Sequence, residues 1–264
     1  MPNARIVSAG WVAGLLLFNQ LGASAVAETD LVDRVFENAD AAPVANDDAE
    51  ATPDVSGDAQ DDPSEDVQAA NVDNGQVTQT FDLRDFNAVK AAGVYTLNVE
   101  VGPEFGVTLS GPAREMSFVE VSVADGALIL DQDEAANAIS NRQSVTATVT
   151  LPALTGLAVA GVVNADVKGV AADAFTAKLS GVGDVRIGGT CGNLRAAISG
   201  VGDFNGRDLV CRAADLSVSG VGDAAVFADE SVDVAVSGMG SVDVYGEPDE
   251  VQKTGGMFAK IRIK

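Results

Sequence analysis

The phrase Ser180-Gly181-Val182-Gly183-Asp184 recurs down the chain, and this repetition decides the fold. Further copies are Ser199-Gly200-Val201-Gly202-Asp203, Ser219-Gly220-Val221-Gly222-Asp223 and Ser237-Gly238-Met239-Gly240-Ser241. An imperfect copy, Ala160-Gly161-Val162-Val163-Asn164, precedes them, and a more divergent copy, Thr254-Gly255-Gly256-Met257, follows. The first glycines lie 20, 19, 20, 18 and 17 residues apart. A unit this short cannot bury its own apolar face, so the copies are expected to stack as coils of a solenoid.

Apolar residues flank each copy at every second position, which is the pattern of a strand with one buried face. Leu179 and Val185 flank one copy in this way, and Ile187 continues the series. The sequence therefore predicts an all-β, parallel β-solenoid (β-helix-like) with about 18–20 residues per coil. An antiparallel array of hairpins is the alternative. The glycines suit corners with positive φ, and the expected structural corners are Gly181, Gly183, Gly200, Gly202, Gly220, Gly222, Gly238 and Gly240.

The N-terminal 27 residues read as a signal peptide. Arg5 precedes an apolar run from Ile6 to Phe18, and Ala25-Val26-Ala27 provides a small-x-small cleavage site. An uncleaved anchor is the alternative. We expect no transmembrane span in the mature chain, and an exported protein of the periplasm, cell surface or medium.

Two regions follow the expected signal peptide. Residues 28–79 contain 15 acids, one base and no hydrophobic period, which predicts an acidic disordered linker. Residues 80–264 are expected to be the folded domain, with an irregular β part at 80–152 and the repeated coils at 153–264.

The composition argues against several classes of function. The chain has a formal net charge of −23, and residues 80–264 hold 24 acids against 14 bases. This excess argues against a nucleic-acid partner. The chain has no histidine, which removes the commonest general base, the Ser/His/Asp triad and nearly all zinc sites. We expect no catalytic residue and no cofactor.

An acidic row lies three positions after each leading glycine: Asn164, Asp184, Asp203, Asp223 and Ser241. The favoured interpretation is that each side chain caps its own turn by accepting backbone N–H groups. A divalent cation between stacked carboxylates is the alternative, with Asp184, Asp203 and Asp223 as weak metal candidates. Calcium-binding nonapeptide repeats recur every nine residues, which does not match this spacing.

A second row lies between the paired glycines: Val162, Val182, Val201, Val221 and Met239. These side chains are expected to point inward and fill a corner. The alternative is an outward apolar ridge that is available to a partner.

Cys191 and Cys211 are the only cysteines, and they follow their leading glycines by 10 and 11 residues. They should therefore be neighbours on adjacent coils, about 4.8 Å apart, which permits a disulfide. An exported chain meets an oxidising compartment, so we predict a Cys191–Cys211 disulfide, with two buried thiols as the alternative.

Taken together, these motifs resemble the bacterial auto-transporter adhesin head domain family, the GIN domain. Phe86-Asn87-Ala88-Val89 with Gly93-Val94-Tyr95 resembles its opening strand. The serial Ser-Gly-x-Gly-Asp phrases and Val244-Tyr245-Gly246-Glu247-Pro248 resemble its C-terminal coils. The resemblance runs from about residue 80 to the end, and it implies an exported all-β domain with a role in adhesion. The chain ends at Lys264 within an expected strand, so self-translocation through a barrel module is not supported.

Two functions from different classes remain. The first is a non-enzymatic cell-envelope or surface module that binds a glycan, another envelope polymer or a protein along one solenoid face, and that could form oligomers. The second is a carbohydrate-active β-helix enzyme that acts on a polysaccharide. Such enzymes use clustered acids on one face, whereas the acids of this chain are mostly at corners.

Overall fold

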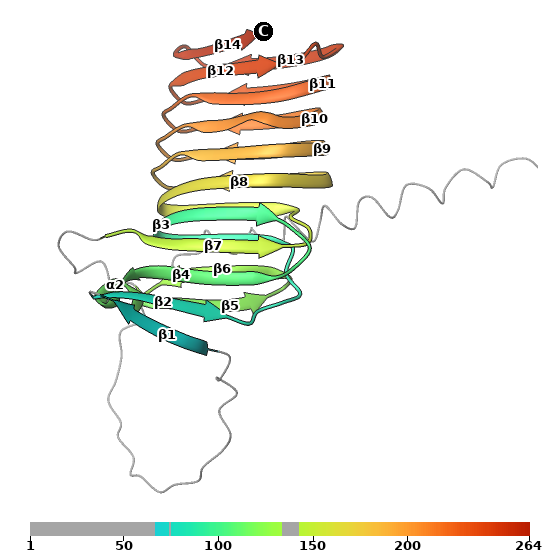
Figure 1. Ribbon diagram of the computed structural model, residues 1–264. Helices are drawn as coiled ribbons and strands as arrows, with labels where there is room; N and C mark the ends of the chain where they lie inside the picture. The colour runs from blue at the N-terminus through green and yellow to red at the C-terminus, as the bar shows by residue number, and fades with distance from the viewer. Residues whose placement is uncertain (1–66, 74, 134–142) are drawn as a thin grey trace, which may run out of the picture. The chain divides into compact units, whose positions relative to one another are not determined.

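The computed structural model describes residues 67–73, 75–133 and 143–264 (Figure 1). The expected signal peptide and the expected linker as far as residue 66 lie outside these ranges. Among the residues that are described, no helix has the length and apolar character needed to cross a membrane.

Nearly all of the described regular structure is strand, with one short helix, α2. The elements are β1 (Val67–Asp73), β2 (Gln76–Phe81), β3 (Ala88–Val101), β4 (Gly106–Pro112), α2 (Ala113–Met116), β5 (Val119–Ala124), β6 (Ala127–Gln132), β7 (Val145–Leu151), β8 (Gly156–Leu179), β9 (Val185–Ile198), β10 (Phe204–Val218), β11 (Ala224–Val236), β12 (Gly240–Tyr245), β13 (Glu250–Gly255) and β14 (Ala259–Ile263).

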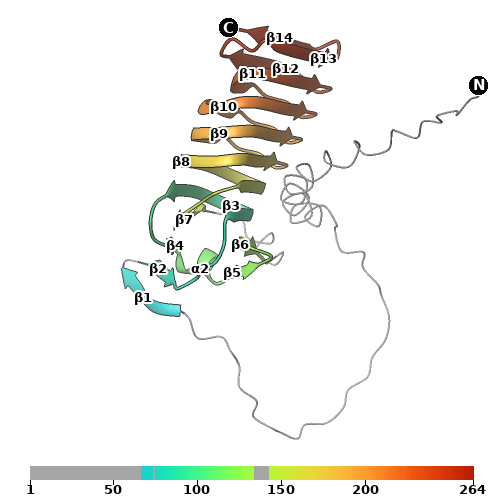
Figure 2. The same ribbon diagram turned by 90° about the vertical axis from the view of Figure 1, so that its right-hand side faces the viewer.

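These strands form one open, largely parallel sheet. Strands β3, β8, β9, β10, β11, β12 and β14 follow one another in parallel, and β13 also pairs with β11. Figures 1 and 2 show this series climbing toward the C terminus. Antiparallel pairs are confined to β1, β2, β4, β7 and the β5–β6 pair. The all-β prediction is confirmed, and the parallel pairing of the repeats excludes the antiparallel hairpin array.

The sheet begins earlier in the chain than expected. Strand β1 pairs with β2, and β2 pairs with β4 from Gln76↔Pro112 to Phe81↔Val107. Residues 67–73 and 76–79, which fall within the expected linker, thus belong to strands β1 and β2. In β2 only Val77 is buried, so this edge region lacks the apolar alternation by which the other strands were recognised.

Equivalent residues of successive repeats pair directly with one another. Val185, for example, pairs with Ala165 on one side and Phe204 on the other. The unequal repeat lengths are accommodated by register shifts within the long strands. These shifts lie between Val167 and Val170, Asn205 and Asp208, Gly206 and Val210, and Cys211 and Ala213. The Gly-rich corners consequently stay aligned even though the repeats differ in length.

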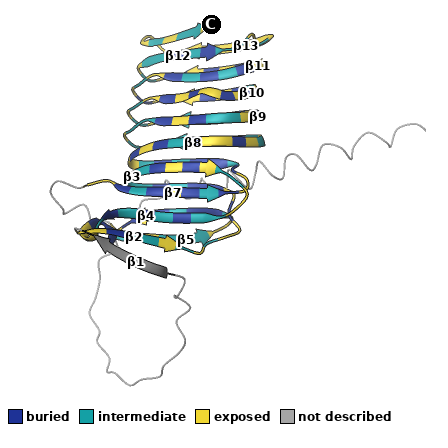
Figure 3. Ribbon diagram, in the orientation of Figure 1, coloured by how far each residue is buried: buried dark blue, intermediate teal, exposed yellow. Residues whose placement is uncertain are grey.

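Buried and exposed residues alternate along the long strands (Figure 3). The buried side chains form a continuous apolar core. In β11, Val232, Val234 and Val236 are buried, whereas Asp233 and Ala235 are exposed. The core is mostly Val, Leu, Ile and Ala, and its largest fully buried side chains include Tyr95 and Phe175. Burying each Val contributes about 1.5–3 kcal/mol before the entropic cost of ordering the chain.

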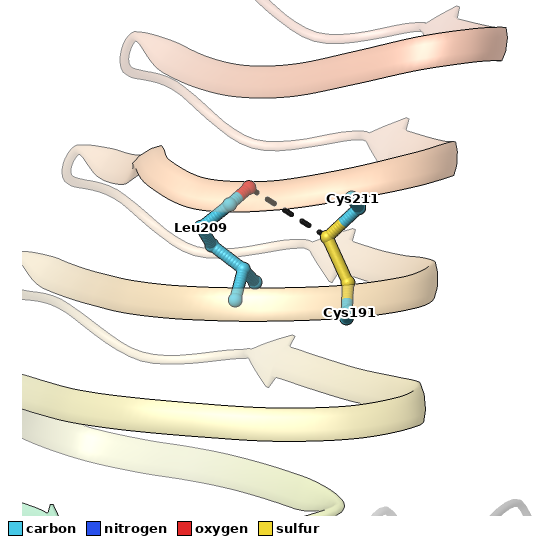
Figure 4. The surroundings of a disulfide bond; sticks show 3 residues. All are labelled: Cys191, Leu209 and Cys211. Atoms are coloured by element: carbon cyan, nitrogen blue, oxygen red, sulfur yellow. Dashed lines mark hydrogen bonds between the residues drawn. A yellow bond between two sulfur atoms is a disulfide. The ribbon is translucent and has the colours of Figure 1, made fainter.

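A disulfide joins Cys191 of β9 to Cys211 of β10 (Figure 4). The two residues pair directly in the parallel register, and their Cα atoms are 4.5 Å apart. Sγ of Cys211 lies 3.6 Å from the carbonyl oxygen of Leu209. This approach is a contact and not a hydrogen bond, because a disulfide sulfur carries no hydrogen. The predicted bridge is confirmed.

Replacing both cysteines with serine is expected to lower the free energy of unfolding by roughly 3 kcal/mol, because the bridge closes a short loop in the unfolded chain. Thermal unfolding of the parent and the Cys191→Ser/Cys211→Ser variant measures this loss. Alkylation of the unreduced exported protein followed by mass spectrometry is the companion experiment. Two modified thiols would contradict the bridge.

Candidate functional site

The Gly-rich corners of successive repeats are hydrogen-bonded to one another. Their central residues form single parallel bridges, Val162↔Val182↔Val201↔Val221↔Met239. Backbone N–H groups of Val201 and Val221 donate to the carbonyl oxygens of Gly181 and Gly200 at 2.9 and 3.0 Å. The corners therefore continue the ladder of the sheet, and they hold their side chains in straight rows.

The glycines permit a backbone approach that no other residue allows. A Cβ atom built on Gly200 would lie 1.8 Å from the carbonyl oxygen of Gly181, far inside contact distance. Gly202 has a φ of 142°, and its Cβ would lie 2.0 Å from the carbonyl oxygen of Gly183. The second glycine of each full copy has positive φ. The first glycine does not have positive φ, and the close approach of the preceding repeat is what requires it.

The central apolar residues point outward. Their exposed fractions are 49% for Val162, 51% for Val182, 51% for Val201, 44% for Val221 and 52% for Met239. The inward interpretation is therefore wrong. Flanking residues such as Leu179 and Val185 already fill the interior beneath the corner, and the central residue has the opposite orientation. We call Val162, Val182, Val201, Val221 and Met239 the ridge.

The acidic row caps successive corners. Oδ1 of Asp184 accepts the N–H of Asp203 at 3.1 Å, and Oδ1 of Asp203 accepts the N–H of Asp223 at 3.0 Å. Asn164 does the same for Asp184. The expected capping role is correct in kind, but the side chains cap the following repeat and not their own, and those that do so are Asn164, Asp184, Asp203 and Asp223. We call Asn164, Asp184, Asp203, Asp223 and Ser241 the acidic row.

The acidic row ends at Ser241, whose N–H and hydroxyl both donate to Oδ1 of Asp223, at 2.9 and 2.7 Å. These bonds, the hydroxyl bond foremost, lower the pKa of the Asp223 carboxyl below its usual value. Within the described ranges, no group of three or more His, Cys, Asp or Glu side chains is arranged to hold a metal ion.

A serine row borders the ridge on its other side: Ser180, Ser199, Ser219 and Ser237, all exposed. The hydroxyls of Ser180 and Ser219 donate weakly to the carbonyls of Val159 and Ile198, both at 3.4 Å. Sequence reasoning did not single out this row, although its regular recurrence was visible. Serine row, ridge and acidic row together form one surface, which we call the repeated corner.

A cluster of charged and aromatic residues joins β12 to β14. Asp243 accepts hydrogen bonds from Arg262 and from Nζ of Lys264, the latter at 2.6 Å. Arg207 and Lys264 lie over the ring of Tyr245, 4.4 and 5.2 Å from its centroid. This cluster was missed from the sequence because its members come from different strands. The alternation of Val242 and Val244 could have placed Asp243 outward.

The chain is similar to a family and to solved structures that are described as putative adhesins. A family model described as "Putative auto-transporter adhesin, head GIN domain" matches residues 85–248. A putative adhesin from Bacteroides fragilis is 24% identical, with a TM-score of 0.62 over 73% of this chain and 98% of that one. A putative adhesin from Parabacteroides merdae is 16% identical, with a TM-score of 0.39 over 72% and 97% of the two chains. No curated protein matches. The family match confirms the resemblance drawn from the motifs.

Gly202→Val is expected to destabilise the domain by about 3 kcal/mol or more, because a β-branched side chain meets both an unfavourable φ and a neighbouring carbonyl. Asp203→Asn should stay within about 0.5 kcal/mol, because an amide oxygen can still accept the N–H of Asp223, as Asn164 does for Asp184. Denaturant unfolding of the two variants measures the contrast.

Melting in calcium and in chelator is the control for the same pair. Equal midpoints are expected for the parent and for Asp203→Asn. A midpoint that rises with calcium only in the parent would replace the capping role with a cation site, and equal small effects of both substitutions would contradict close stacking of the corners.

The Asp243 cluster is expected to lose its contribution to stability in acid. The hydrogen bond from Lys264, followed by that from Arg262, lowers the pKa of Asp243 from its ordinary value of 3.8. A lowered carboxyl pKa stabilises the fold above the unfolded value, and this stabilisation disappears as the pH falls through the folded value. The melting difference between the parent and Asp243→Asn should therefore shrink below about pH 4. A difference that stays constant from pH 7 to pH 2 would refute this assignment.

Proposed function

The chain belongs to the head GIN domain family of putative auto-transporter adhesins, and from that premise we propose that it is an exported, non-enzymatic envelope or surface module. It binds an envelope polymer, a glycan or a protein along the repeated corner. Residues 1–27 direct export, and the acidic stretch from residue 28 to about residue 66 is a linker on the N-terminal side of the domain.

One observation carries the proposal, namely that the five apolar side chains of the ridge are half-exposed and form one continuous row. A single exposed Val is ordinary, but an unbroken line of half-exposed apolar side chains bordered by polar rows is characteristic of an interaction site. The hydrogen bonds between corners hold the line straight without a partner. Binding along it therefore costs little ordering entropy.

The proposed architecture is a parallel β-solenoid in which each coil contributes one corner. The in-register pairing from β8 to β12 and the spacing of the Gly-rich phrases support it. In such a fold each coil contacts its neighbours, and the binding surface lengthens with each coil.

The alternative, a carbohydrate-active enzyme, has weaker support. Hydrolysis of a glycosidic bond requires a carboxylic acid and a carboxylate placed on either side of the bond. In the acidic row, Asp184, Asp203 and Asp223 accept backbone N–H groups of the following repeat, which is a structural use of the carboxylate. The net negative charge also disfavours nucleic acid as the partner.

A binding assay on neutral and acidic glycans and on cell-envelope proteins tests the proposal. The parent should bind at least one probe, and Val182→Lys/Val221→Lys should weaken that binding at least tenfold, because two charges interrupt the ridge. Val210→Lys is the matched control, since Val210 is 40% exposed and lies in β10 outside the ridge. Equal binding by all three proteins would show that the binding site lies outside the ridge. Release of shorter sugars from any glycan would favour the enzyme.

A further inference from the structure

We propose that the repeated corner packs against the same corner of a second copy of this chain, with the two ridges parallel about a two-fold axis that runs along them. This inference rests on the proposed function, because it takes the ridge to be the binding surface and names its partner. Two properties of the corner support it, namely the spacing of the ridge and the order of the rows beside it, and the modest size of the corner sets the strength of the contact.

The spacing of the ridge selects the partner. Its side chains recur once per paired strand, at the interstrand spacing of about 4.8 Å. A partner can meet every ridge residue only if its own contacts recur at that spacing. A helix repeats at about 5.4 Å per turn, so it would lose register along the row. A second stack of parallel strands has the matching interval, and a second copy of this chain provides one with the same apolar side chains.

The order of the rows selects the arrangement. The chain passes each corner in the order serine, ridge residue, acid, so the serine row and the acidic row lie on opposite sides of the ridge. Rotation about an axis along the ridge places each acidic row opposite the partner's serine row, where hydroxyls can donate to carboxylates. Rotation about an axis across the ridge would instead place Asp184, Asp203 and Asp223 opposite the same three carboxylates, which is repulsive.

The size of the surface sets the strength of the contact. Four steps of about 4.8 Å give a strip about 19 Å long. A strip of this length that is only three side chains wide covers less than the roughly 800 Å² per partner of a stable complex. The dimer should therefore be weak, with a Kd on the order of 100 μM. Chains displayed close together would be the setting in which such a contact is populated.

Sedimentation equilibrium of the full exported chain, from about 10 μM to about 1 mM, tests the association. The parent should show a reversible monomer–dimer equilibrium. Val182→Lys/Val221→Lys should weaken it at least tenfold, with an unchanged melting temperature because the ridge lies outside the core. Val210→Lys should dimerise as the parent does. A monomeric parent at all concentrations, or equal dimerisation of all three proteins, would overturn the proposal.

Cysteine cross-linking tests the arrangement. The two native cysteines are joined to each other, so a single introduced thiol reports on the contact. In the parallel arrangement, Val162→Cys, Val201→Cys and Met239→Cys should each form a cross-linked homodimer under mild oxidation, and Val210→Cys should not. Cross-linking of Val162→Cys only with Met239→Cys would show the antiparallel arrangement and refute the one proposed.

The two proposals can fail separately. A monomeric parent whose glycan or protein binding is lost in Val182→Lys/Val221→Lys would retain the ridge as a binding surface and reject the second copy as its partner. A dimer that depends on the ridge, in a chain that binds none of the probes, would support self-association and reject the broader binding role.

Discussion

The close approach of backbone at the corners is the constraint on which the rest of this structure depends. Across the full repeats, a Cβ on either corner glycine would lie 1.8–2.0 Å from a carbonyl oxygen of the preceding repeat. Only glycine lets the strand ladder continue through the turn. Once the corners are paired, residues on both sides enter the same register, so identical side chains form rows. The core, the acidic row and the ridge all follow from this alignment.

The acidic row shows how such an alignment makes a costly arrangement tolerable. Stacked carboxylates at about 5 Å repel one another. Here each carboxylate receives an N–H from the next repeat, so the negative charge of one residue supports the backbone of its neighbour. The row begins with the neutral Asn164 and ends with Ser241, whose hydroxyl adds a second donor to Asp223. Each carboxylate of the acidic row therefore has a hydrogen-bond donor from the following repeat.

Much of this architecture could be predicted from the sequence, because the same short motif recurs in every repeat and its spacing therefore describes the whole stack. The parallel stacking, the corner glycines and the Cys191–Cys211 bridge all follow from the spacing of the copies. The direction of Val201 could not be predicted, because a residue between two glycines has no neighbouring pattern to orient it. The Asp243 cluster and the pairing of β2 depend on contacts between distant segments, which a linear reading does not contain.

The register shifts within the long strands make the alignment of the corners independent of the length of each repeat. Between Gly206 and Val210, β10 carries residues that have no counterpart in β11, yet Val218 and Val236 at the far end are paired again. Extra residues there leave the corners where they were. A difference in length between two repeats is therefore taken up within the strands, and the rows on the corners keep their spacing.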